Sequence, residues 1–226
     1  RRPLGASNLA GALRFAAASP YPRSVMPAAG SHPAMCAAIT GLDGTFLALH
    51  RTFLEVMALG RATKLATVPK AKIVTGRYAG GLVRLRNGTI ENAETGEWRE
   101  APKLGELGAK KPGLIERGWH GPALDAIHLT EGIENALSLA CACPDYRVAA
   151  AVSIANLARV DLPEAITRVV IWADNAAPTG PDGGPHAARR ALDKAVGWHV
   201  GHGRTVEIAR CPEGFKDVND YWCSVA

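Results

Sequence analysis

Hydrophobic and polar residues follow two different patterns along this chain. In the first half, the apolar runs Met35–Thr40 and Thr45–Leu54 flank Asp43-Gly44. Asp-Gly between two apolar runs is typical of a β-hairpin. Further short apolar runs occur at Ile73–Val74 and Leu82–Leu85. Residues 34–86 are therefore predicted to form a small, antiparallel, β-rich unit.

The second half alternates between strand-like and helix-like segments. Strands are predicted at Ala126–Thr130, Arg147–Val152, Arg168–Ala173 and Arg204–Ala209, each rich in apolar residues. Apolar residues recur at helical spacing from Ile133 to Ala140 and from Ala188 to Val196. Strand-helix repetition predicts the fold class α/β, with a mostly parallel sheet and flanking helices.

The remaining segments have weaker patterns. Residues 1–33 are rich in Ala, Pro, Gly and Ser and are expected to be irregular, with a short helix around Asn8–Ala17. Residues 87–122 are polar, with Gly and Pro mixed in, and are expected to be a hairpin and loop insertion. The predicted domains are thus an irregular segment 1–33, a basic β-rich subdomain 34–122 and an α/β domain 123–226.

Composition narrows the class of protein. Of the 226 residues, 47% are hydrophobic, and no apolar run is long enough to cross a bilayer. Five cysteines without a CxxC pair favour a reducing cytosol over a disulfide framework or a zinc site. We therefore expect a cytoplasmic protein without a membrane partner. Because the chain starts at Arg1 rather than Met, we expect a fragment of a longer chain or a processed product.

Charge is distributed unevenly. Residues 1–86 contain twelve Lys or Arg and two acids, whereas residues 87–226 contain fourteen basic and nineteen acidic residues. A basic half joined to an acidic half suggests that one binds a polyanion and the other a metal. The alternative for the basic run alone is a solvated basic surface.

Three acidic residues, each expected at the end of a strand, are the strongest candidates for chemistry. They are Glu131, Asp174 and Asp217, equally spaced along the chain, with Asp220 close behind the last. Working residues of open α/β sheets collect at the carboxyl ends of the strands. A carboxylate cluster there is suited to Mg²⁺, with phosphates as further ligands. Helix caps and turns remain the structural alternatives for each residue alone.

These motifs resemble a known family. Glu131-Gly132-Ile133-Glu134, Asp174-Asn175-Ala176 and Lys216-Asp217-Val218-Asn219-Asp220 resemble, in order, the three acidic motifs of Toprim domains, over roughly Ala126–Trp222. His50-Arg51-Thr52-Phe53-Leu54 and Gly80-Gly81-Leu82-Val83-Arg84-Leu85 resemble the segment that precedes Toprim in primase-like proteins of phages, plasmids and integrated elements.

The resemblance implies a DNA primase core that makes short primers on a single-stranded DNA template from nucleoside triphosphates, with Mg²⁺ or Mn²⁺ as cofactor. Asp174 and Asp217 would be metal ligands, Asp220 an outer member, and Glu131 a general base or further ligand. The template backbone or triphosphates would be bound by basic residues of the first half: Arg51, Lys64, Lys70, Lys72, Arg77 and Arg84. A replicative helicase, separate or in a missing part of the chain, would be the partner in a bacterial or phage-infected cell.

Two positions depart from the family pattern. Ala176 stands where a second Asp is expected, which weakens one metal site unless Asp182 substitutes for it. Asn135 stands where many Toprim proteins have an acid, and it would orient a ligand without adding charge. Two alternatives therefore stay open: a metal-dependent nuclease or topoisomerase-like Toprim enzyme, and a non-catalytic module that binds single-stranded nucleic acid.

Overall fold

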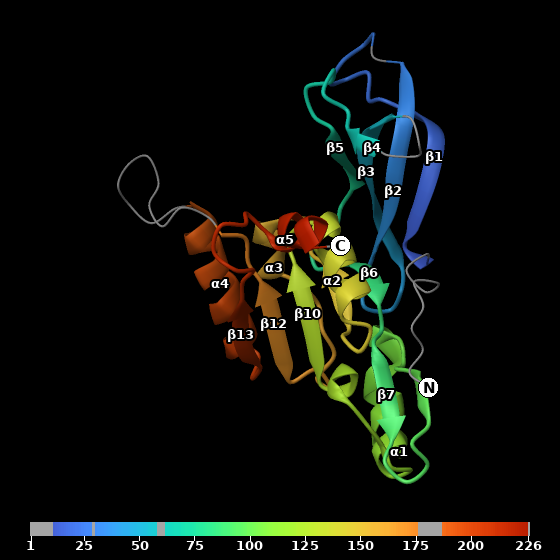
Figure 1. Cartoon of the computed structure of the whole chain (residues 1–226), viewed down its shortest axis with the longest axis vertical. Coiled ribbons are helices and arrows are strands. Elements are labelled where there is room, and N and C mark those ends of the chain that lie inside the picture. The colour runs from blue at the N-terminus through green and yellow to red at the C-terminus, as the bar shows by residue number, and fades with distance from the viewer. Residues whose placement is uncertain (1–10, 29, 58–61, 176–186, 226) are drawn as a thin grey trace.

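The computed structural model describes residues 11–28, 30–57, 62–175 and 187–225. Three sheets occur in this described part, and the two larger ones lie side by side in Figure 1. The predicted class is confirmed, because a β-rich N-terminal region precedes a mixed α/β region that contains parallel strands. Within the described residues, no helix is long and apolar enough to cross a membrane.

The first sheet is antiparallel, with strand order β1-β2-β3-β4, and β5 also pairs with β3. Its hairpin lies where Asp43-Gly44 predicted it: the Asp43 carboxylate accepts hydrogen bonds from the backbone and hydroxyl of Thr45, and Gly44 has a positive φ of 89°. The strands are β1 (Leu13–Pro20), β2 (Ser31–Thr40), β3 (Phe46–Val56), β4 (Ala62–Lys64) and β5 (Lys72–Gly76).

Strand β1 corrects one prediction. The expected helix around Asn8–Ala17 is wrong where the structure describes it, because Leu13–Pro20 pairs with β2 as an edge strand. Alanine favours helices, but the chance to pair with the exposed edge of β2 overrides this weak local preference. Residues 8–10 lie outside the described residues.

The second sheet has the order β13-β12-β10-β11-β6, in which β10, β11, β12 and β13 are parallel. Strand β6 (Val83–Arg86) pairs antiparallel with β11, so the run predicted for the N-terminal unit belongs to this sheet instead. The four parallel strands closely match their predicted positions. They are β10 (Ala126–Thr130), β11 (Val148–Ala150), β12 (Arg168–Trp172) and β13 (Thr205–Ala209).

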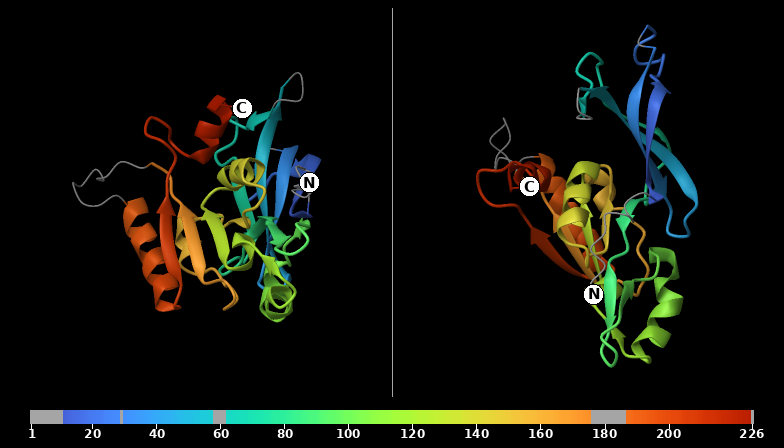
Figure 2. Two further views of the ribbon diagram at one scale, coloured as in Figure 1. Left: turned by 60° about the horizontal axis from the view of Figure 1, so that its bottom comes forward. Right: turned by 45° about the vertical axis from the view of Figure 1, so that its right-hand side comes forward.

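Helices cover both faces of this sheet (Figures 1 and 2). On one face, α2 (Ile133–Ala142) packs on β11 and β6 and contacts α5 (Val218–Val225). On the other, α3 (Ile154–Leu157) packs against α4 (Ala187–Gly201). The side chains of β11 show the division, since Ala149 joins the apolar cluster of α3 and α4 while its neighbours Val148 and Ala150 join that of α2.

Residues 87–122 contain more structure than their sequence predicted. Three short strands form a sheet in the order β8-β7-β9, and the helix α1 was not expected because Pro112 and two glycines lie inside it. The Arg99 guanidinium lies 3.7 Å from the centre of the Trp119 ring and covers it. The elements are β7 (Thr89–Asn92), β8 (Trp98–Glu100), the 3₁₀ helix Leu104–Glu106, α1 (Leu107–Ile115), β9 (Trp119–His120) and the 3₁₀ helix Pro122–Leu124.

Candidate functional site

Glu131 and Asp174 are brought together by two adjacent parallel strands. Thr130 and Trp172 are register partners at the carboxyl ends of β10 and β12; Glu131 comes directly after Thr130, and Asp174 comes two residues after Trp172. The carboxylates are close enough to interact electrostatically: the charge of Asp174 raises the pKa of Glu131, and the charge of Asp217 raises the pKa of Asp174. The sequence correctly placed the first two acids at one edge of the sheet.

Asp217 reaches the site in a different way from the one predicted. It does not end a strand, because β13 ends at Ala209 and a loop follows up to α5. Asp217 instead caps α5, with its Oδ1 accepting a hydrogen bond of 2.9 Å from the backbone N–H of Asp220. Asp220 Oδ2 accepts one of 3.0 Å from the backbone N–H of Lys216. Both acids therefore hold the start of this helix, and the charge of Asp217 also raises the pKa of Asp174.

Burial controls the ionisation of the two central acids. It is the main cause that raises the pKa of Glu131, followed by repulsion from Asp174. A backbone hydrogen bond from Ile154 and the charges of Lys72 and Lys216 act in the opposite direction. Burial likewise raises the pKa of Asp174, followed by repulsion from Asp217. Both groups consequently release their protons less readily than an exposed carboxyl group does.

The loop that brings Ile154 to Glu131 is strained. Val152 has a φ of 71°, which is rare for a β-branched residue and costs about 1–3 kcal/mol. Ser153 follows and caps α3 by accepting a hydrogen bond from the backbone of Asn156. The strain lies directly after β11, at the same edge of the sheet as the two acids. No residue pattern in the sequence indicates this conformation.

Asn135 holds Asp174 in place. Its Nδ2 donates a hydrogen bond of 3.0 Å to Asp174 Oδ1, and its own Oδ1 accepts one of 3.1 Å from the backbone N–H of Asn219. The buried amide therefore connects the acid after β12 with the first turn of α5. This is the orienting contact, without added charge, that the sequence suggested for this position.

The carboxylates suit a divalent cation that is shared with a substrate. Within the described residues, no three His, Cys, Asp or Glu side chains lie close enough to form a complete metal site. Mg²⁺, however, is commonly held by one or two carboxylates together with substrate phosphates and water. Glu131 and Asp174 form such a pair, and their repulsion adds to burial, the larger cause, in raising the pKa of Glu131. Ala176 and Asp182 lie outside the described residues.

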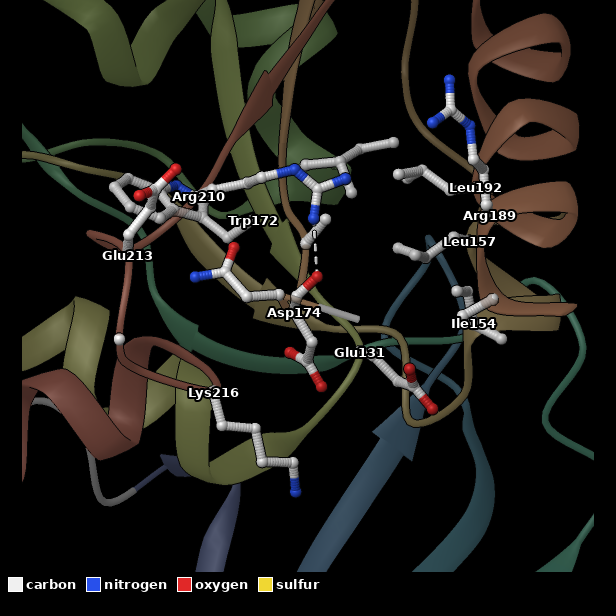
Figure 3. Close-up of a pocket in the computed structure, with 15 residues that line it drawn as sticks. Glu131, Ile154, Leu157, Trp172, Asp174, Arg189, Leu192, Arg210, Glu213 and Lys216 are labelled. Atoms are coloured by element: carbon white, nitrogen blue, oxygen red, sulfur yellow. Dashed lines mark hydrogen bonds between the residues drawn. The ribbon is translucent and has the colours of Figure 1, made fainter. Parts of the chain in front are cut away.

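A cavity of about 650 Å³ opens beside the two acids (Figure 3). In the described part of the chain, Arg189 of α4, Arg210 after β13, and Lys216 before Asp217 contribute positive charge to its lining. Arg210 Nη1 donates a hydrogen bond of 2.6 Å to the backbone carbonyl of Asp174. Apolar side chains complete the wall, among them Ile154, Leu157, Trp172 and Leu192.

The sequence missed these three basic residues. The long basic run lies in the first half of the chain, whereas the basic residues that line the cavity belong to the acidic half. A signal was present for two of them. Arg210 directly follows the last parallel strand, and Lys216 directly precedes a motif acid.

Of the predicted basic residues, two support the fold of the first sheet. Arg51 Nη1 donates a hydrogen bond of 2.6 Å to the Pro20 carbonyl, and its guanidinium lies 5.4 Å from the centre of the Phe53 ring. Arg84 is half-buried and donates to the Gly41 carbonyl, and burial lowers its pKa. Both guanidinium groups have partners within the fold, and Arg51 also lines a separate cavity of about 1040 Å³.

The other four candidates, three lysines and one arginine, are exposed. Lys64 and Lys72 form ion pairs with Glu134 of α2, at 3.4 Å and 2.8 Å. The Lys70 backbone contacts the Tyr21 hydroxyl, and its side chain is exposed. Arg77 lies with Arg159 in a separate cavity of about 390 Å³. The structure therefore does not gather the six predicted residues into one patch.

Comparison with known proteins divides the chain in a similar way. Residues 126–226 match the family described as the Toprim domain, and residues 1–85 match a domain of unknown function, DUF7146. No curated protein matches the chain. The expected Toprim domain is thereby confirmed, and it contains Glu131, Asp174 and Asp217.

Similar solved structures include three bacterial or phage primases. The primase fragment of the bacteriophage T7 primase-helicase is 12% identical, with 85% of this chain and 58% of that chain covered and a TM-score of 0.46. A DNA primase domain from Pseudomonas aeruginosa is 15% identical, with 92% and 52% covered and a TM-score of 0.44. The E. coli primase catalytic core is 13% identical, with 84% and 48% covered and a TM-score of 0.42. The chain thus spans about half the length of these proteins.

Proposed function

We propose that this chain is the catalytic core of a primase-type nucleotidyltransferase that makes short primers on single-stranded DNA. The observation that carries the proposal is that Glu131, Asp174 and three cationic side chains line one cavity in the part of the chain that matches the Toprim domain. Paired carboxylates beside a cationic wall match what a metal-bound triphosphate needs. The substrates would be nucleoside triphosphates and a single-stranded template.

The cationic side chains would bind the triphosphate. Arg210 and Lys216 belong to the loop between β13 and α5, and Arg189 projects from α4 on the other side of the cavity (Figure 3). A guanidinium group can form two hydrogen bonds with a phosphate, whereas an ammonium group acts as a point charge. The apolar surface of Ile154, Leu157 and Leu192 would face the base or sugar.

Glu131 and Asp174 would hold the divalent cation, Mg²⁺ or Mn²⁺, with Asp217 close by. A bound cation of this kind supplies charge neutralisation of the triphosphate and activation of a 3′-hydroxyl. Asn135 would keep the Asp174 carboxylate in one orientation, because its amide donates to Oδ1. The helix cap made by Asp217 and Asp220 would fix the loop that contains Lys216.

Glu131 would also be the candidate general base. Burial raises its pKa towards the pH at which the protein works, and a base is most effective when its pKa lies near that pH. The backbone hydrogen bond from Ile154 would orient the carboxylate towards the cavity. A 3′-hydroxyl presented there would transfer its proton to Glu131 as its oxygen bonds to the α-phosphorus of the incoming nucleotide, and the bond from that phosphorus to the bridging oxygen would break to release pyrophosphate.

The cellular setting proposed is the replication machinery in the cytoplasm of a bacterial or phage-infected cell. A primase acts where a helicase has separated the strands, so a replicative helicase would be its partner, on another chain or in another part of the same protein. The charge asymmetry supports a role on a nucleic acid, since twelve of the 26 basic residues lie in the first 86 positions with only two acids.

Template-dependent primer synthesis tests this function directly. The chain is incubated with mixed single-stranded templates, labelled nucleoside triphosphates and Mg²⁺ or Mn²⁺, beside the Glu131→Gln and Ala176→Asp variants. We expect the wild type to make labelled products and Glu131→Gln to make none. If the metal needs a second carboxylate at position 176, Ala176→Asp should make more product than the wild type. No product from the wild type or from Ala176→Asp would reject the proposal, and metal-dependent cutting of the template would indicate a nuclease instead.

A second candidate is a non-catalytic module for single-stranded nucleic acid. The observation that favours it is the lack, within the described residues, of three potential ligands close enough for a metal. Such a module would bind oligonucleotides equally well with Mg²⁺ or with a chelator, and binding would weaken steeply as salt increases. Binding that requires the metal would exclude this candidate.

A further inference from the structure

A small ionic cluster joins the first sheet to the Toprim domain. Glu134, in the first turn of α2, accepts a hydrogen bond of 2.8 Å from Lys72 Nζ of β5 through Oε2. Lys64 Nζ of β4 lies 3.4 Å from its other oxygen, Oε1. Two ammonium groups from the basic half thus surround one carboxylate of the acidic half. The pKa of Glu134 is lowered despite its burial, and Lys72 is the main cause.

Both lysines lie on the face of the first sheet that turns towards α2. Register pairing places Phe15, Met35, Thr52 and Lys72 in one row across β1, β2, β3 and β5. Directly paired residues share a face of a sheet, and Met35 packs against the apolar cluster that contains α2. Lys64 pairs with Leu54, two residues beyond Thr52, and therefore lies on the same face.

Buried polar atoms without partners accompany this cluster. His50 and Thr52 are 4% and 2% exposed, and within the described residues His50 Nδ1 and Thr52 Oγ1 have no hydrogen-bond partner. Thr52 is the register partner of Lys72, and His50 feels the charges of both Lys72 and Glu134. Such groups cost free energy when they are unsatisfied, so their presence suggests a place for further oxygen atoms.

We propose that the Glu134 carboxylate occupies, in the free protein, the place of a phosphate of single-stranded nucleic acid, which must displace it to bind Lys64 and Lys72. This inference rests on the proposed function and adds that the Glu134 carboxylate competes with nucleic acid for the two lysines. A phosphate and a carboxylate make the same charge-assisted hydrogen bonds with ammonium groups. A phosphate has additional oxygen atoms for the Thr52 hydroxyl and for the imidazole of His50.

The same face favours a nucleic-acid strand over a free nucleotide. Phe15, at the other end of the row from Lys72, is 64% exposed although it is a large aromatic residue. Bases stack on exposed aromatic side chains while cations bind the backbone, which is the usual arrangement for single strands. The upper part of this sheet extends past α2 and the carboxyl ends of the parallel strands (Figures 1 and 2). A strand lying there would lead towards the acidic site.

The test compares Glu134→Gln and Lys72→Gln, which remove opposite members of the same ion pair. Binding of a labelled oligothymidylate of about 16 nucleotides is measured by fluorescence anisotropy with a chelator present, so that metal ligands play no part. We expect Glu134→Gln to bind about fivefold more tightly, the equivalent of an ion pair of about 1 kcal/mol, and Lys72→Gln to bind more weakly. The double variant with both substitutions should not bind the oligonucleotide more tightly than the wild type.

A purely structural bridge gives a different result. If the pair only held the two parts together, both single variants would lower the melting temperature and both would weaken binding. Glu106→Gln is the matched control, because it breaks an exposed Lys110–Glu106 pair on the distant helix α1. Equal or weaker binding by Glu134→Gln, or tighter binding of ATP alone, would overturn the inference while leaving primer synthesis intact. Failure of every form to bind the oligonucleotide would instead reject the proposed function itself.

Discussion

The two large sheets use their charged residues in opposite ways. In the first sheet, Arg51 donates hydrogen bonds to the Pro20 carbonyl and to the Thr75 hydroxyl and so holds the strands together. In the second sheet, Glu131 and Asp174 lie together at the strand ends, where burial and mutual repulsion raise the pKa of Glu131. The charged group of the first sheet has hydrogen-bond partners that stabilise the fold, whereas the two carboxylates of the second sheet are held close together although their repulsion costs free energy. The basic half therefore contributes less to the site than its composition suggests.

The largest difference between the regions should appear in catalysis. Glu131→Gln removes the candidate base and one metal ligand and should lower the rate of primer synthesis by about 10²–10⁴-fold. The measurement is the initial rate with Mg²⁺ at saturating nucleotide. Glu106→Gln, on the exposed surface of α1, is the control and should retain the wild-type rate. A Glu131→Gln variant with nearly full activity would remove this residue from the mechanism.

Substrate binding should depend on the cations of the second sheet. Arg210→Ala removes a guanidinium from the cavity and should raise the KM for nucleotide about 10–100-fold, the effect of losing charged hydrogen bonds of about 1.5–3 kcal/mol. Because such binding is largely shared by ground and transition states, kcat should change less. Arg168→Ala, at the opposite end of β12, should leave KM unchanged. An equal rise of KM in both variants would show that nucleotide binding depends only on the net charge of the protein.

Stability should depend on the cations of the first sheet. Arg51→Ala removes hydrogen bonds to Pro20 and Thr75 and the contact with Phe53, and should lower the free energy of unfolding by about 1–3 kcal/mol. Urea unfolding measures this loss, and kcat at low temperature should remain close to that of the wild type. If Arg51→Ala were as stable as the wild type but inactive, this arginine would be a substrate ligand, as the sequence first suggested.

The smallest effect concerns pH and the stability of the site. The folded pKa of Glu131 is raised, so its favourable contribution exists at low pH and is lost as pH rises through that pKa. At neutral pH the buried carboxylate therefore destabilises the wild type, and Glu131→Gln should have a higher melting temperature. Thermal unfolding between pH 3 and 8 should show this difference shrinking in acid, as the pH falls through the raised pKa of Glu131. A difference independent of pH would contradict this assignment.

The sequence predicted the second half of the fold well. The four parallel strands and the helices α2 and α4 lie close to their predicted positions, because apolar strands and one-sided helices have strong patterns. The first sheet was less predictable. Its edge strand β1 has three consecutive alanines at its centre, and pairing with β2 makes it a strand. The Leu82–Leu85 run joins the other sheet, which no local pattern could reveal.

The candidate site was predictable where the backbone alone determines it. Glu131 and Asp174 follow strands that were predicted to be parallel, so both acids could be placed at the same edge of the sheet, and the structure adds that the two strands are neighbours. Arg51 and Lys72 show the opposite case. Sequence shows that a residue is basic, but not that its charge is used by a backbone carbonyl or by Glu134. Arg210 and Lys216 were missed because their role depends on the path of a loop.

Divalent-cation binding at the acidic pair tests the central claim most directly. Mn²⁺ binding is followed by electron paramagnetic resonance, with a non-hydrolysable nucleoside triphosphate present, for the wild type, Asp174→Asn and the control Glu106→Gln. If Asp174 and Glu131 hold the cation beside the triphosphate, the wild type and control bind Mn²⁺ together with nucleotide, and Asp174→Asn binds it at least tenfold more weakly, a loss of about 1.4 kcal/mol. Equal Mn²⁺ binding by all three proteins would contradict the placement of the metal and, with it, the proposed catalytic centre.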